Sequence, residues 1–190
     1  RQHIEAGALH RVLAPLELGL TLARRLQDTA AEIDLLTLWA LWGLGQENGA
    51  ALERALYEIE RIAPVPPALQ PVHTLLKAYQ YVLDEQGERA LEVLEGVPPF
   101  ANERLEIWRV TAQVTARLRL QGQTPSLDSD WLTGLQGWAE AGAPERKRKL
   151  LGWRGIVAYR CARYGEAARL HQLAAESKSD RVARVSSLMN

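Results

Sequence analysis

A short sequence motif, of a composition typical of helices, recurs about every 38 residues and constrains the fold of this chain most strongly. Its clearest copies are Gly-Glu-Arg-Ala-Leu at 87–91 and Gly-Glu-Ala-Ala at 165–168, each opening the second helix of a pair. Counting back 38 positions from Ala90 reaches Leu52, in Leu-Glu-Arg-Ala-Leu, and a further 38 reaches Ala14. Self-similarity at this period is typical of stacked helix pairs, because one pair alone cannot bury its apolar face.

Apolar residues recur at three- and four-residue spacing along almost the whole chain, and Gly, Pro and Asn mark the breaks between them. We expect Pro15 to kink or restart the first helix, because proline removes one bond of the helical ladder. No segment alternates as a strand would. We therefore predict an all-α, α-α superhelix of about five antiparallel pairs, forming a single domain over 1–190. The expected helices cover 8–26, 30–44, 50–62, 69–83, 88–94, 102–120, a segment between Asp128 or Ser129 and Gly142, 150–162, 166–175 and 181–189.

Composition favours a cytoplasmic protein with no membrane contact. Apolar residues make up 47% and charged residues 24% of 190, which is ordinary for a globular chain. No apolar run approaches the roughly 20 residues that cross a bilayer. Cys161 is the single cysteine, so no internal disulfide points to an oxidising compartment. Because the chain starts without Met and ends within an apolar-periodic segment, we expect a fragment of a longer multidomain protein.

A net charge of zero hides an uneven distribution. From Glu145 onward there are 11 Lys and Arg against 4 Asp and Glu, whereas the first 144 residues hold 12 against 19. The chain is therefore an acidic array with a basic C-terminal end. Such an asymmetry can orient partners through electrostatic steering.

The last helix pair resembles a tetratricopeptide (TPR) repeat. Large and small residues fall at that family's spacing, and small ones let the two helices approach closely. The resemblance implies that Tyr164 fills the space between neighbouring pairs. The matching residues are Leu151, Gly155, Ala162, Tyr164, Ala167 and Ala174.

A second resemblance concerns Leu-Thr-Leu-Ala-Arg-Arg-Leu-Gln-Asp at 20–28, followed by Ala31 and Glu32, with an echo at 170–180 containing a Lys-Ser-Asp turn. This sequence pattern is similar to those in the TPR-like arrays of large bacterial transcriptional regulators of the MalT and LuxR kind. The resemblance implies a sensor region beside nucleotide-binding and DNA-binding domains. Such a region binds a protein or peptide partner, or a small effector, and controls oligomerisation.

Aromatic residues supply the first candidate site. Trp39 and Trp42 are three positions apart and share a helix face, and we add Tyr79 from a later helix. Their rings could line a groove for a peptide or a sugar. The alternative is packing between helices, which is the usual role of aromatic residues at helical spacing.

A basic run supplies the second candidate site: Arg146, Lys147, Arg148 and Lys149. Cations in the first turns of a helix oppose its dipole, and a bound anion would offset that cost. An acidic peptide, a phosphate or a nucleic acid could supply the anion. A solvated helix face is the alternative, and direct nucleic-acid contact is disfavoured because no aromatic residues interleave the run.

The sequence offers no set of groups for catalysis. The four histidines form no metal signature, and there is neither a phosphate-binding GxxxxGK[ST] nor a GxGxxG motif. We predict no enzymatic activity, no metal and no cofactor. The predicted function is a non-catalytic module for protein interaction and effector sensing. The alternative is a structural scaffold or an oligomerisation adaptor that senses no ligand.

Overall fold

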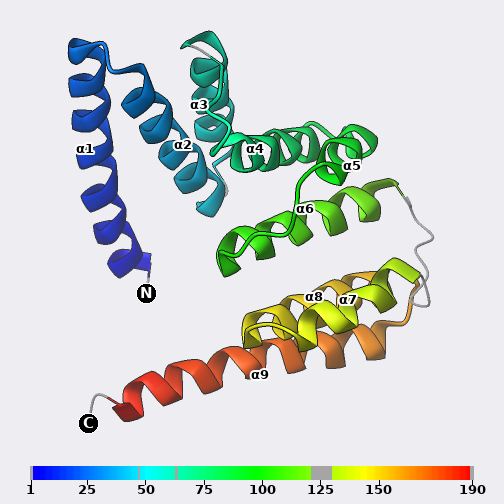
Figure 1. Cartoon of the computed structure of the whole chain (residues 1–190). Helices are drawn as coiled ribbons and strands as arrows, with labels where there is room; N and C mark the ends of the chain where they lie inside the picture. Colours follow the sequence, from blue (N-terminus) through cyan, green and yellow to red (C-terminus); the bar gives the residue numbers. More distant parts are fainter. Residues whose placement is uncertain (1, 47, 63, 121–129, 189–190) are drawn as a thin grey trace. The chain divides into compact units, whose positions relative to one another are not determined.

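The computed structural model describes residues 2–46, 48–62, 64–120 and 130–188, and the side chains of 13–176 within those ranges. Across these residues the chain forms nine helices and no strand, so the predicted all-α class is confirmed (Figure 1). Over the same ranges, no helix has the length and apolar character needed to cross a membrane. The helices are α1 (Gln2–Leu26), α2 (Thr29–Gly45), α3 (Gly49–Ile62), α4 (Gln70–Leu83), α5 (Gly87–Glu95), α6 (Glu103–Leu120), α7 (Asp130–Glu140), α8 (Pro144–Arg160) and α9 (Tyr164–Leu188).

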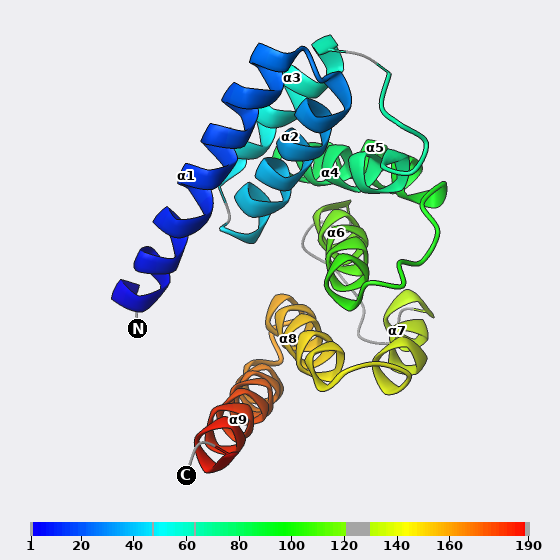
Figure 2. The same ribbon diagram turned by 60° about the vertical axis from the view of Figure 1, so that its left-hand side comes forward.

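Contacts along the chain divide it into two compact units, Arg1–Pro98 and Pro99–Asn190, which we call unit 1 and unit 2. In unit 1, α1 packs on α2, α2 on α3, and α4 on both α3 and α5 (Figure 2). Leu20, Ile33, Leu36 and Ile59 form a buried cluster shared by α1, α2 and α3. A second cluster, around Leu52, Leu56 and Leu76, continues this core to α4.

Three turns of the chain have the same backbone geometry. Gln27, Glu85 and Ala162 each adopt a positive φ, of 56°, 62° and 57°, one or two residues after the ends of α1, α4 and α8. In each case the next N–H donates to the carbonyl five positions earlier: Asp28 to Ala23, Gln86 to Tyr81, and Arg163 to Ala158. This is the Schellman arrangement that satisfies the free carbonyls at a helix end. The same connector therefore joins three helix pairs in the chain.

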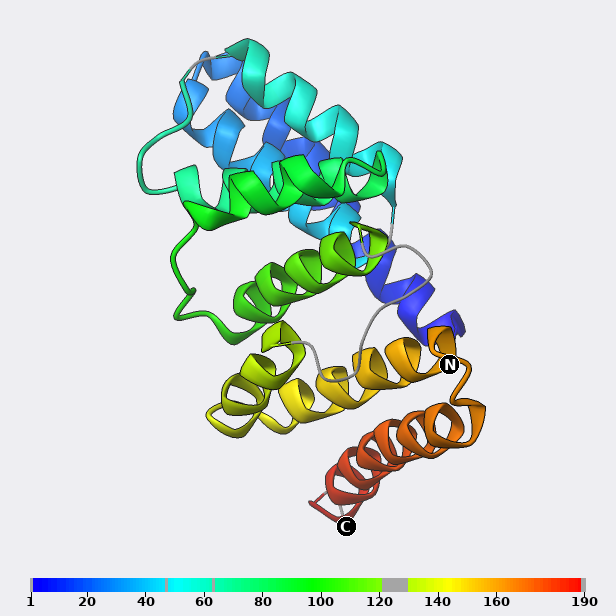
Figure 3. The ribbon, with the colours of Figure 1, turned by 90° about the vertical axis from the view of Figure 1, so that its right-hand side faces the viewer.

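Unit 2 is built around α8, which packs on α7, on α9 and on α6 (Figure 3). Its core contains Val110, Val114, Leu132, Leu150 and Val157. The rings of Trp138 and Trp153 stack on this cluster with their centroids 5.8 Å apart. Both indoles thus serve packing between helices, which was the alternative for aromatic residues at helical spacing.

The helix pair α8–α9 shows the close approach that small residues predict. A Cβ on Gly155 would lie 2.8 Å from Nε2 of His171, so the glycine makes room for that ring. Tyr164 differs from the expectation, because it is 62% exposed. Its ring packs edge-on against the ring of Tyr159, with the two ring centres 5.4 Å apart. It therefore lies on the surface of this pair.

Two expectations about helix continuity concern Pro15 and the segment 178–180. Pro15 lies inside α1, which continues through it without restarting. The predicted turn at 178–180 is wrong, because α9 is one helix from Tyr164 to Leu188. Lys, Ser and Asp each cost a helix less than about 0.7 kcal/mol, whereas a helix break usually takes Gly or Pro.

Candidate functional site

The basic run lies in the first turns of α8. Ala143 is extended, and Pro144 occupies the first helical position, where its fixed φ suits a helix and its missing N–H costs nothing. Successive residues of a helix point about 100° apart, so four neighbouring cations cannot share one face. The structure accordingly sends the four side chains in three directions.

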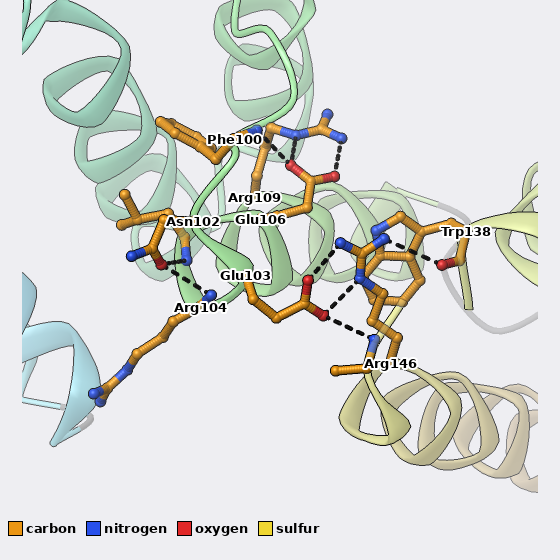
Figure 4. Close-up of polar contacts among 10 residues, drawn as sticks. Phe100, Asn102, Glu103, Arg104, Glu106, Arg109, Trp138 and Arg146 are labelled. Atoms are coloured by element: carbon orange, nitrogen blue, oxygen red, sulfur yellow. Dashed lines mark hydrogen bonds and ion pairs between the residues drawn. The ribbon is translucent and has the colours of Figure 1, made fainter. Parts of the chain in front are cut away.

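Arg146 points into unit 2 (Figure 4). Its guanidinium bonds both oxygens of Glu103, at 2.8 and 2.6 Å, and lies 5.0 Å from the ring centre of Trp138. It also donates to the backbone oxygen of Trp138 at 3.3 Å. The pair raises the pKa of Arg146 and lowers the pKa of Glu103. Arg146 thus joins α6, α7 and α8, and its side chain is only 14% exposed.

Glu106 forms a second acidic centre beside that pair. Asn102 caps α6 by accepting the N–H groups of Arg104 and Leu105, which sets Glu103 and Glu106 one turn apart on the helix. Glu106 is buried, bonds Arg109 at 2.8 and 2.6 Å, and accepts the N–H of Phe100 at 3.0 Å (Figure 4).

The charge of Glu106 depends on those donors. Burial alone would raise the pKa of its carboxyl, but the bonds from Arg109 and from the Phe100 N–H outweigh that effect, so the pKa is lowered. A carboxylate that is ionised and fully engaged in this way has a structural role. It fixes the start of α6, on which Glu103 stands.

Arg148 and Lys149 lie on the side of α8 that faces α9. They border a groove of about 350 Å³ between the two helices. Arg148 also pairs with Glu145 at 2.9 Å, whereas Lys149 forms no ion pair among the described side chains. The groove is lined by Arg148, Lys149, Gly152, Trp153, Ile156, His171, Ala174 and Ala175.

The chemistry of the α8–α9 groove combines cations with small apolar residues. Gly152, Ala174 and Ala175 leave space between the helices, and Ile156 offers a side chain that is 38% exposed. Cations around an apolar floor fit a ligand that carries both carboxylates and aliphatic groups.

Lys147 lies on the opposite side of α8. With Arg154 it borders a smaller groove of about 230 Å³ against α7, which also includes Gln136, Glu140 and Leu151. Neither cation forms an ion pair within the described part of the chain. The basic run therefore serves an internal ion pair and two separate surfaces, and it forms no single patch.

The aromatic candidates lie in unit 1 as half-buried side chains. Trp39 packs against the cluster of Leu20, Ile33, Leu36 and Ile59, and the Arg54 guanidinium lies 5.7 Å from its ring centre. Tyr79 packs against the neighbouring cluster. Trp42 is half-buried on α2. Their role in binding stays a prediction.

A groove of about 340 Å³ on α3 and α4 lies near these aromatic residues but is lined by others, including Glu53, Tyr57 and Glu60. Its charges are largely matched within the chain. Arg54, which also lines it, pairs with Glu58 at 3.1 Å, and Lys77 pairs with Glu60 at 2.6 Å. It therefore attracts a charged ligand less strongly than the α8–α9 groove does.

Sequence reasoning did not single out Ile156, His171 and Ala174 as part of a binding surface. Their contribution depends on α9 lying along α8, which no local pattern reports. A weak signal existed, because Gly152 and Ile156 stand one turn apart on the same helix face. Comparisons with known protein families, with curated proteins and with solved structures found no match to this chain.

Proposed function

We propose that this chain is a non-catalytic, TPR-like interaction module whose α8–α9 groove binds a short acidic and amphipathic peptide segment. The observation that carries the proposal is the groove itself, with Arg148 and Lys149 beside an apolar floor. A carboxylate near Lys149 would gain an ion pair, and a leucine-sized side chain would cover Ile156 and the alanines of α9.

The repeat architecture also supports a binding role. The three equal turns after α1, α4 and α8 favour a superhelix of similar helix pairs. The resemblance at 20–28 leads us to propose further that the module belongs to the sensor region of a larger cytoplasmic bacterial transcriptional regulator. Binding in the groove would then change how neighbouring helix pairs pack, and so the activity of attached domains.

The test uses a fluorescein-labelled peptide of ten residues in which leucine and glutamate pairs alternate. Fluorescence anisotropy at low and high salt measures its affinity for the whole chain. We expect binding that weakens as salt screens the charges. Lys149→Glu should weaken it by about tenfold, equivalent to about 1.4 kcal/mol.

Arg154→Glu is the matched control, because it makes the same charge change on the other side of α8. We expect it to alter the affinity by less than about threefold. Equal losses from Lys149→Glu and Arg154→Glu would mean that only net charge matters and would remove the α8–α9 groove from the proposal. Absence of binding at low salt would do the same.

A further inference from the structure

The charges of the chain divide between its two compact units. Unit 1 contains 8 Lys and Arg against 14 Asp and Glu, and unit 2 contains 15 against 9. The surpluses are equal and opposite, so two copies of the chain can pair an acidic unit with a basic unit. This holds for any placement of the two units within one copy.

Ion pairs within each unit engage part of its minority charge. In unit 1, Arg24 bonds Glu32 and Glu58, and Lys77 bonds Glu60. In unit 2, Glu103 and Glu106 are engaged by Arg146 and Arg109, and Glu145 and Glu166 also have arginine partners. What remains at the surface is acidic on unit 1 and basic on unit 2.

Some of the excess acidic residues of unit 1 lie together on one face of α5. Glu88, Glu92 and Glu95 are exposed and stand at i, i+4 and i+7, with half-buried Leu91 between them. Among the described side chains, these three carboxylates form no ion pair. The face therefore presents carboxylates around an aliphatic side chain, which is the complement of the α8–α9 groove.

The acidic face of α5 carries charge at the unfavourable end of its helix. Glu92 and Glu95 stand in the last turn of α5, which has no cation to offset them. Each such charge costs about 0.3–1 kcal/mol against the helix dipole, and the cost falls when an opposite charge binds. Local conflicts of this kind are typical of functional surfaces.

We propose that the α8–α9 groove of one copy binds the acidic face of α5 of a second copy. The proposal rests on the proposed function for the location of the groove, and it names the occupant. Two copies can exchange this contact reciprocally in a closed dimer, or they can share a single contact and leave one free surface of each kind. The second arrangement builds open chains or closed rings of copies.

The test is sedimentation velocity of the whole chain at increasing concentration, in about 50 mM and about 500 mM NaCl. One variant reverses α5 (Glu88→Lys, Glu92→Lys and Glu95→Lys), and a second reverses the groove (Arg148→Glu and Lys149→Glu). We expect the wild-type chain to associate at low salt and to dissociate at high salt. Each variant alone should stay monomeric, and an equimolar mixture of the two should associate again.

Restored association in the mixture shows that the groove of the α5 variant and the α5 face of the groove variant are still folded, because these two unaltered surfaces can pair as in the wild-type chain. A wild-type chain that stays monomeric at every concentration would overturn the proposal. So would association of either variant alone at wild-type strength, or a mixture that stays monomeric. If the wild-type chain is monomeric yet binds the leucine–glutamate peptide, the proposed function stands and the inference about a second copy is wrong.

Discussion

The guanidinium of Arg146 and the carboxylate of Glu103 form a two-pronged ion pair that joins positions 43 residues apart in the chain. Because the same guanidinium lies on the ring of Trp138, one side chain links α6, α7 and α8. The groove formed by α8 and α9 is therefore built on a helix whose first turn is fixed by this contact.

We predict that Arg146→Ala lowers the free energy of unfolding of unit 2 by about 1–2 kcal/mol. That value is below the cost of breaking a fully buried pair, because Glu103 is 41% exposed and screened by water. Urea denaturation measures the loss, and hydrogen exchange should localise it to α6–α8. Arg154→Ala removes an exposed arginine of the same helix and should change stability by less than about 0.5 kcal/mol. Equal effects of the two substitutions would contradict the role given to Arg146.

Glu106 should make unit 2 sensitive to acid. Its native pKa is lowered, so its contribution is complete above the ordinary carboxyl pKa of about 4.3 and is lost as the pH falls through the lower native value. We predict that Glu106→Gln costs about 2 kcal/mol at pH 7, because it leaves Arg109 without a charged partner. The variant should also lose less stability than the wild-type chain between about pH 5 and pH 3. Equal acid slopes in urea denaturation would refute this.

His73 should act in a different pH range. Its side chain is buried, Nε2 has no hydrogen-bond partner among the described atoms, and burial together with Lys77 lowers its pKa. The native state binds the His73 proton less tightly than the unfolded chain does. The contribution of neutral His73 to the stability of unit 1 is therefore fully present above about pH 6.5 and is lost as the pH falls below it. We predict a flatter dependence on pH for His73→Gln. NMR titration of the His73 ring checks the pKa directly, and a normal value would contradict the prediction.

The left-handed turn residues offer a way to stabilise the chain. Ala162 has a φ of 57°, which costs a residue with a side chain about 1–2 kcal/mol but costs glycine little. We predict that Ala162→Gly raises the free energy of unfolding by about 0.5–1 kcal/mol after the entropy of glycine is counted. Ala168→Gly is the control, because the same change inside α9 should lower it by about 0.5–1 kcal/mol. Thermal unfolding compares the two, and a loss of stability in both would show that Ala162 is unstrained.

The sequence predicted the existence and limits of most helices. Gly, Asn and Pro at the breaks, and apolar residues at helical spacing, decide these features locally, as the Asn102 cap and the Pro144 start of α8 show. The sequence missed the continuity of α9, because its polar segment at 178–180 resembles a turn but lacks a residue that ends a helix.

The same local rules cannot say which cations reach a partner. In the sequence, Arg146, Lys147, Arg148 and Lys149 are one basic run. In the folded chain the first is bound by Glu103, the second lies toward α7 and the last two lie toward α9. Helical rotation separates the side chains, and the neighbours packed on each side of α8 decide their surroundings. The sequence by itself determined most of the helices and the charges that they carry. Only the tertiary structure decided which of these charges form ion pairs within the chain and which remain accessible to a partner.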